Sequence, residues 1–150
     1  MVIGDLPADA VDVVREIATT QHAPLSQYGQ DFQVTPHPDG QLDFQDGAHT
    51  LSGCTVRLVG HHQRSNAAVA VAALHRIQAQ LPVTAHAMRE GLRTVRWPGR
   101  IDVVCADPLI ILDGAHNLEA LECLLAELPT LLQRRCCHLL FGTCLLYTSP

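Results

Sequence analysis

The sequence contains no lysine, because all ten of its basic residues are arginine. Aromatic residues make up only 4% of the 150 residues, and the formal net charge is −5. We therefore expect no nucleic-acid partner, since neutralising phosphates requires a clustered basic face. No run approaches the roughly 18 apolar residues of a membrane span, and no basic stretch leads into an apolar run at the start. These absences predict a cytoplasmic protein without a membrane partner.

The six cysteines and nine histidines form no familiar metal-ligand pattern. No Cys-x-x-Cys pair and no helical His-x-x-x-His pair occurs, and most cysteines lie inside apolar runs, where free cysteine behaves as a small hydrophobe. We therefore predict no metal site and no disulfide framework. The apolar fraction of 47% is that of an ordinary folded protein, so disorder of the whole chain is not expected.

The residues up to Trp97 predict a mixed α/β unit. Residues 2–3 are typical of the end of a strand, Pro7 opens a helix, and residues 28–58 alternate short strands with Asp-Gly turns at 39–40 and 46–47. An alanine-rich helix is predicted over 66–80 and a second helix from Thr84 to Gly91. The expected buried face of the first of these is Ala67, Ala70, Val71, Leu74 and Ile77.

A breaker cluster at 97–99, Trp-Pro-Gly, marks the predicted domain boundary. Beyond it we expect strands over 101–105 and 109–112, a helix over 118–132 and a further buried strand over 136–141. The last three of these have the proportions of a βαβ crossover in an open parallel sheet.

The most informative stretch follows the apolar run 109–112 and consists of Asp113, Gly114, Ala115, His116 and Asn117. Ligands of open α/β sheets lie beyond the carboxyl ends of the strands, where a carboxylate can accept from ribose hydroxyls or from water around a metal. Gly114 and Ala115 allow close backbone approach, and Asn117 stands at a helix start that favours phosphate. The alternative is that the Asp or Asn only caps the helix and His116 fills the turn.

A second stretch, 60–67, precedes the alanine-rich helix. Gln63 and Asn66 are one turn apart, so both amides can point the same way, and paired donors and acceptors suit the edge of an adenine ring. The alternative is that Asn66 or Ser65 is a plain helix cap. A third stretch, 97–100, presents Arg100 on a Pro-Gly bend. Its guanidinium fork can hold phosphate oxygens, or it can simply lie on a solvated turn.

Taken in order, the stretches 62–67, 97–100 and 113–117 resemble the folylpolyglutamate/dihydrofolate synthases of the Mur ligase superfamily. The likeness extends from about Val2 to Gly142, and the spelling of the motifs is of the folate type rather than that of the peptidoglycan ligases. The resemblance implies an α/β fold: the C-terminal part of a Mur-ligase central ATPase-like domain over 1–97, then the start of a Rossmann-like Mur-ligase C-terminal domain over 98–142. Residues 143–150 are expected to be a non-native tail.

The implied activity is an ADP-forming ligation that adds L-glutamate to dihydropteroate or folate through an acyl phosphate, with ATP and Mg²⁺ as cofactors. By similarity, Gln63 and Asn66 would contact adenine, Arg100 the phosphates, and Asp113 the ribose or nearby water. His116 and Asn117 would also face the nucleotide, with Arg100 and His116 as the catalytic candidates. The implied protein is a monomer.

The family's phosphate loop, magnesium ligands and carbamylated lysine are expected upstream of this chain, because the sequence has no lysine. We therefore predict a part of the ATP site that is inactive alone. Small departures from the family occur at Leu118, where proline is usual, and at Asp102, where glutamate is commoner. Two alternatives remain open: a piece of a Mur-type peptide ligase, or a non-catalytic nucleotide-binding module.

Overall fold

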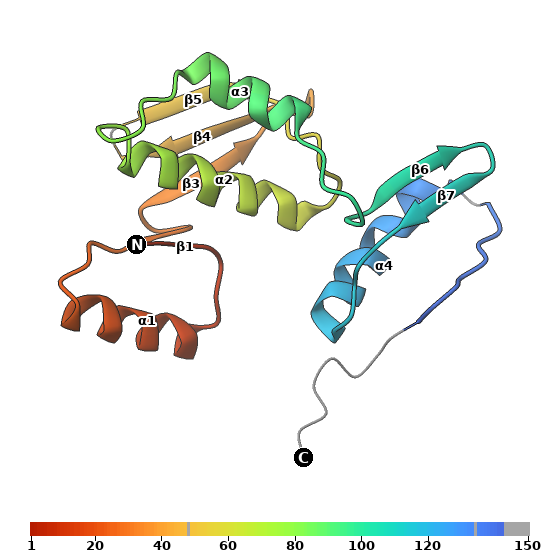
Figure 1. The fold of residues 1–150 in the computed structure, drawn as a ribbon, viewed down its shortest axis with the longest axis horizontal. Helices are drawn as coiled ribbons and strands as arrows, with labels where there is room; N and C mark the ends of the chain where they lie inside the picture. Colours follow the sequence, from red (N-terminus) through yellow and green to blue (C-terminus); the bar gives the residue numbers. More distant parts are fainter. Residues whose placement is uncertain (48, 134, 143–150) are drawn as a thin grey trace. The chain divides into compact units, whose positions relative to one another are not determined.

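The computed structural model describes residues 1–47, 49–133 and 135–142, and the chain divides into two compact units, Met1–Trp97 and Pro98–Pro150 (Figure 1). The predicted non-native tail, 143–150, lies outside the described residues. Both units mix helices and strands. That they correspond to the central and C-terminal domains of a Mur ligase stays a prediction.

The first unit opens with two short parallel strands that flank a helix. Strand β1 (Val2–Ile3) pairs with β2 (Ser26–Gln27), and helix α1 (Ala8–Thr20) lies between them in the chain. Pro7 is the N-cap of α1, as predicted from the fixed φ of proline. The apolar face of α1 is only partly covered, because Ala18 is buried whereas Val13 and Ile17 are exposed.

Three antiparallel strands follow in the order β3-β4-β5, which confirms the predicted run of short strands with tight turns. They are β3 (Phe32–Pro36), β4 (Leu42–Asp46) and β5 (His49–Cys54). The register places Phe44 opposite both Val34 and Leu51. One face of this sheet is therefore apolar and must be covered.

Two helices supply that cover: α2 (His61–Arg76) packs against β3 and β4, and α3 (Ala85–Thr94) against β5 (Figure 1). Thr84 caps α3 as predicted, since its hydroxyl accepts from the amide of Ala87 at 3.1 Å. The core of the unit joins sheet and helices and comprises Phe32, Leu42, Phe44, Leu51, Cys54, Ala67, Ala68, Val71, Ala72 and Met88.

The predicted bounds of the alanine-rich helix were wrong at both ends. α2 begins at His61 rather than at Asn66, and it ends at Arg76 rather than at Gln80. Its buried face is also rotated: Ala68 and Ala72 are buried, while Ala70 and Ile77 of the predicted face are exposed. Alanine adds little directional information to a helical pattern, so the sheet decides which alanines it covers.

In the second unit, β6 (Asp102–Ala106) and β7 (Leu109–Leu112) form an antiparallel pair, and α4 (Leu118–Leu132) follows with its predicted bounds. The predicted βαβ unit with a parallel strand over 136–141 is wrong, because these residues form no strand and are exposed. A β-strand forms only where a neighbouring strand makes hydrogen bonds to its backbone N–H and C=O groups. None of the described residues pairs with 136–141.

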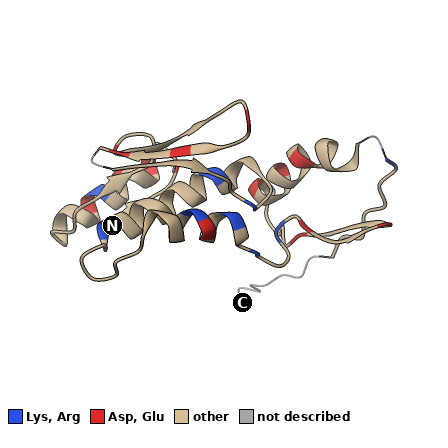
Figure 2. Ribbon diagram, turned by 90° about the horizontal axis from the view of Figure 1, so that it is seen from above, with Lys and Arg blue, Asp and Glu red and all other residues tan. Residues whose placement is uncertain are grey.

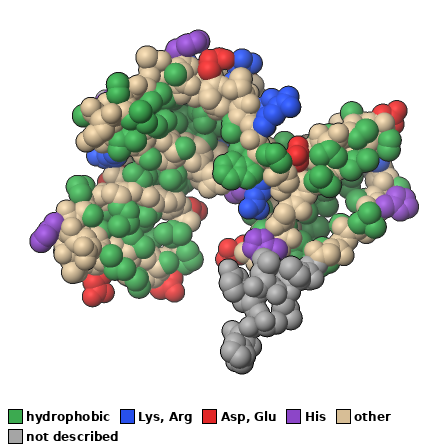
Figure 3. Space-filling model, in the orientation of Figure 1, with side chains coloured by type: hydrophobic (Ala, Val, Ile, Leu, Met, Phe, Trp, Pro, Cys, Tyr) green, Lys and Arg blue, Asp and Glu red, His purple; other side chains and the backbone are tan. Residues whose placement is uncertain are grey.

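The hydrophobic side chains of this second unit are poorly covered. No residue of α4 is buried, and exposed apolar side chains gather over the hairpin and helix (Figure 3). The strand β7, expected to be covered on both faces, instead exposes Ile110 and Leu112. The described residues of this unit therefore form little buried core, and local contacts mainly define its hairpin, turn and helix.

Charged residues are interspersed along both units (Figure 2). Two ion pairs lie within helices: Arg15 and Asp12 are 3.0 Å apart in α1, and Arg93 and Glu90 are 2.7 Å apart in α3. Among the described residues, no helix combines the length and the apolar character that crossing a bilayer requires.

Candidate functional site

The carboxylate of Asp113 ties two of the predicted motifs together. Its Oδ2 accepts from the amide of Ile101 at 2.7 Å, and its Oδ1 accepts from the amide of Ala115 at 2.8 Å. A third bond runs from the amide of Gly114 to the carbonyl oxygen of Gly99, at 2.8 Å. The bend at 98–100 and the turn between β7 and α4 are thereby held as one piece. Asp113 stands at the carboxyl end of β7, as predicted.

These three hydrogen bonds, called the Asp113 bracket below, position Arg100. Its Nη1 lies 3.9 Å from the point that a Cβ on Gly114 would occupy. The residues on either side have left-handed backbones, with φ of 72° at Gly99 and 47° at Ile101. Within the part of the chain that the structure describes, no hydrogen bond or ion pair to the exposed Arg100 guanidinium is found. A fixed backbone thus presents a fork whose donors remain available to an anion.

His116 and Asn117 lie at the start of α4 beside this bend. The Nδ1 atom of His116 is 2.9 Å from the carbonyl oxygen of Gly114. Because a carbonyl only accepts, this contact places the proton on Nδ1 and leaves Nε2 as an acceptor in the neutral ring. The Oδ1 of Asn117 accepts from the amide of Ala120 at 2.9 Å, so Asn117 caps the helix. Its Nδ2 is the atom left for a ligand.

The other motif occupies the first two turns of α2. The Nδ2 of Asn66 donates to the Oε1 of Gln63 at 3.4 Å, so the two amides meet as the one-turn spacing predicts. The Nε2 of Gln63 lies 2.9 Å from the Nε2 of His62, and Gln63 is buried whereas Asn66 is exposed. A fixed glutamine therefore orients an asparagine that can reach a ligand.

The alternative that Ser65 or Asn66 caps this helix is wrong, because both lie inside α2. Its N-cap is Gly60, with a φ of 116°. A Cβ at Gly60 would lie 2.6 Å from Cε1 of His62, which real contacts do not allow. Only glycine gives this turn both its backbone conformation and its space for the ring.

One cluster of polar side chains was missed by the sequence analysis. Asp46, His49 and His75 bring their ligand-type atoms within 4.8 Å of one another. Asp46 is part of the predicted Asp-Gly turn at 46–47 and His49 follows it, but His75 comes from the far end of α2, so no local spacing in the sequence predicts the cluster.

Comparison with known proteins gives a consistent result. No protein-family model matches the chain. The folylpolyglutamate synthase of Lacticaseibacillus casei is 33% identical over 137 residues, which are 87% of this chain and 32% of that protein. The dihydrofolate synthase/folylpolyglutamate synthase of Bacillus subtilis is 32% identical over 120 residues, which are 76% of this chain and 28% of that protein.

Solved structures agree with these sequence matches. A folylpolyglutamate synthase in complex with AMPPCP and folate matches with a TM-score of 0.75 at 32% identity, over 87% of this chain and 33% of that one. The ADP complex of the Mycobacterium tuberculosis enzyme matches with a TM-score of 0.74 at 26% identity, over 85% of this chain and 29% of that one.

The chain therefore has a mixed α/β fold that matches part of the folylpolyglutamate synthase structures. The chain belongs to the folylpolyglutamate synthase/dihydrofolate synthase family, which confirms the resemblance drawn from its three motifs. It spans about a third of the length of the curated relatives it matches.

Substituting two glycines by alanine should have opposite effects. Gly60→Ala forces a side chain into a left-handed backbone and against His62, so we expect the unfolding free energy to fall by about 1–3 kcal/mol. Gly91→Ala fills open space inside α3 and should raise it by about 0.5–1 kcal/mol. Urea unfolding of both variants measures the difference, and equal effects would contradict the role of Gly60.

Removing the Asp113 carboxylate should loosen the bend that carries Arg100. Asp113→Ala leaves the amides of Ile101 and Ala115 without acceptors, at a cost of about 1 kcal/mol for such partly buried groups. Hydrogen exchange should therefore accelerate at those two amides. Glu122→Ala, which removes an exposed carboxylate from α4, is the matched control. Unchanged exchange in the Asp113 variant would show that the bracket does not hold the bend.

Proposed function

We propose that this chain supplies part of the ATP site of an ADP-forming ligase that joins L-glutamate to folate or dihydropteroate through an acyl phosphate. The observation that carries the proposal is Arg100: exposed, available to an anion, and held against the turn before α4 by the Asp113 bracket. Relatives crystallised with AMPPCP and with ADP support a nucleotide as the anion.

Within the second unit, Arg100 binds phosphate oxygens in this proposal. The free amides at the start of α4 and the Nδ2 of Asn117 add further donors. His116 faces the nucleotide with its Nε2 as an acceptor in the neutral ring, or as a donor when protonated. Asp113 has lone pairs left beyond its two backbone bonds, which can accept from a ribose hydroxyl or a water.

Within the first unit, Asn66 contacts the edge of the adenine. The buried Gln63 orients it, because its Oε1 accepts from the Nδ2 of Asn66. Asn66 keeps its Oδ1 as an acceptor and its second amide hydrogen as a donor, which is the pair an adenine edge requires.

These side chains contribute to the reaction mainly by placing positive charge and hydrogen-bond donors beside the phosphates. Phosphoryl transfer leaves negative charge on the transferring group, and fixed donors aimed at that charge lower the barrier. Arg100 serves this purpose because its fork is preorganised by a backbone bracket. Mg²⁺, expected from the resemblance, would meet at this turn the single carboxylate of Asp113, each of whose oxygens already accepts from one backbone amide. No step is assigned to the metal at this turn.

The chain alone should bind a nucleotide weakly and turn over none. Phosphoryl transfer in the family relies on a lysine-bearing loop, and this sequence has no lysine. We expect the purified 150-residue chain to release no ADP from ATP in the presence of glutamate and folate. ADP should still shift the NMR amide signals of Arg100, Gly114 and His116. Steady ATP turnover would contradict the assignment as a partial site, and an absence of shifts would contradict the site itself.

In a ligase of full family length that contains this segment, Arg100→Ala should lower kcat/KM for ATP strongly. A lost charge-assisted contact to the transferring group is worth about 3 kcal/mol, or on the order of 100-fold. Arg100→Lys keeps the charge but loses the fork, so it should be intermediate. Arg93→Ala, which removes an exposed arginine paired with Glu90, serves as the control. Unchanged kinetics for Arg100→Ala would remove Arg100 from the site.

A further inference from the structure

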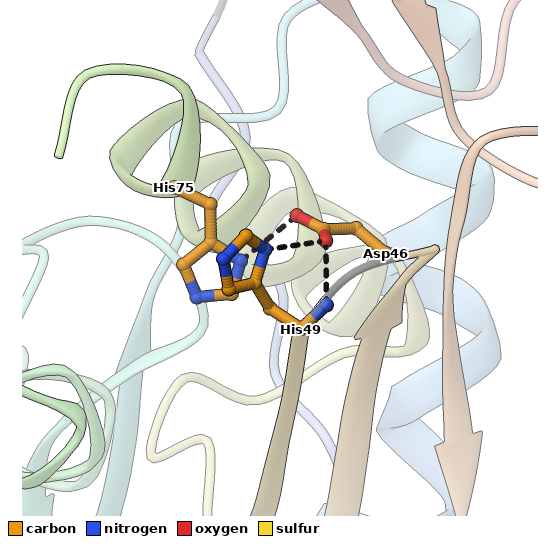
Figure 4. Close-up of side chains that lie close together, drawn as sticks. All are labelled: Asp46, His49 and His75. Atoms are coloured by element: carbon orange, nitrogen blue, oxygen red, sulfur yellow. Dashed lines mark hydrogen bonds and ion pairs between the residues drawn. The ribbon is translucent and has the colours of Figure 1, made fainter.

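Three side chains from three elements converge beside the three-stranded sheet (Figure 4). Asp46 ends β4, His49 begins β5, and His75 lies in the last turn of α2. The Oδ2 of Asp46 is 2.9 Å from the Nδ1 of His75, and its Oδ1 is 3.1 Å from the Nδ1 of His49. The two rings lie 4.9 Å apart, centre to centre. Both imidazoles thus turn the same nitrogen toward one carboxylate.

The carboxylate is buried and charged. Asp46 is only 7% exposed, and it borders a small pocket lined by Phe32, Phe44 and Ala72. Burial by itself raises the pKa of Asp46, but the hydrogen bonds from His75 and His49 outweigh it and hold the pKa below the usual value. A buried carboxylate in this setting needs compensating partners.

The spacing of the three ligand atoms is close to that of a metal site. Zinc bonds of about 2.0–2.2 Å at tetrahedral angles separate neighbouring ligand atoms by about 3.4 Å. One ligand atom from each residue lies within 4.8 Å of the others. The 2.9 and 3.1 Å contacts reach different oxygens of Asp46, so binding one ion requires rotation of the carboxylate and the two rings. Two imidazoles and one carboxylate are also a ligand set that suits a divalent transition ion.

We propose that Asp46, His49 and His75 bind a divalent transition-metal ion of the Zn²⁺ type. The ion takes the place of the two Nδ1 protons, each neutral ring keeping its single proton on Nε2 instead, and it neutralises the carboxylate. Its fourth position opens on the side of His49, whose side chain is 57% exposed. Such an ion ties the turn between β4 and β5 to the end of α2.

This site is separate from the proposed adenine contacts of the same unit. Twelve positions of α2 separate Gln63 from His75, which at 1.5 Å per residue is about 18 Å along the helix. Loss of the metal and failure of the nucleotide proposal are therefore distinguishable, because neither site shares a residue with the other.

The test is a titration of the metal-free 150-residue chain with Zn²⁺, followed by calorimetry, and with Co²⁺, followed by its visible spectrum. We expect one tight site with the absorption of a tetrahedral Co²⁺ ion. His49→Ala should weaken the Zn²⁺ affinity at least tenfold without unfolding the chain, because this side chain is largely exposed. His37→Ala is the matched control: His37 pairs with Asp43 at 3.0 Å on the same hairpin, and no third ligand joins them among the described residues. It should leave the affinity unchanged.

NMR of the histidine rings identifies the ligands directly. Zn²⁺ should move the ring signals of His49 and His75 together at one equivalent and leave that of His37 in place. Three results would overturn the proposal: no Zn²⁺ binding at micromolar concentration, equal affinity in the parent chain and His49→Ala, or first movement of the rings of His61 and His62 instead.

Discussion

The close packing of small side chains on the sheet is the constraint on which the first unit depends. Ala67, Ala68 and Ala72 let the backbone of α2 approach the aromatic rings of Phe32 and Phe44, and all five residues are buried. Close-packed interiors have low compressibility, so a displacement at one point is transmitted to its neighbours. The two ends of α2 are therefore fixed by its middle, so one apolar contact locates both the amide pair at the start of the helix and the imidazole at its end.

The second unit lacks such a core and relies on hydrogen bonds instead. Its helix buries no residue, yet the bend at 98–100 is held by backbone groups that converge on Asp113 and Gly99. An arginine loses much side-chain conformational entropy when it binds a ligand. Fixing its backbone beforehand reduces the remaining cost of binding. Because the chain has no lysine, a cationic side chain that binds phosphate here, such as Arg100, is a planar guanidinium.

Short stretches of sequence predicted most helices and turns correctly. The predictions that were wrong depended on contacts between residues far apart in the chain. The cap at Thr84 and the helix from Leu118 to Leu132 follow from their own residues. The strand over 136–141 failed, because an apolar run becomes a strand only beside a partner. The site motifs were found through their order along the chain. The bond between His75 and Asp46 spans 29 positions, and no periodicity in one sequence reveals such a pair.

The carboxylates of Asp113 and Asp46 differ in what donates to them, and this difference decides what each can do. Asp113 is held by backbone amides, which cannot give up their protons without breaking the bend. It is therefore confined to positioning its neighbours and to accepting with its remaining lone pairs. Asp46 accepts from one backbone amide, that of His49 at 3.1 Å, and from two imidazole nitrogens, which become ligands once their proton moves to Nε2. A carboxylate thus fixes a bend in one unit and, in the proposed metal site, joins two imidazoles in the other.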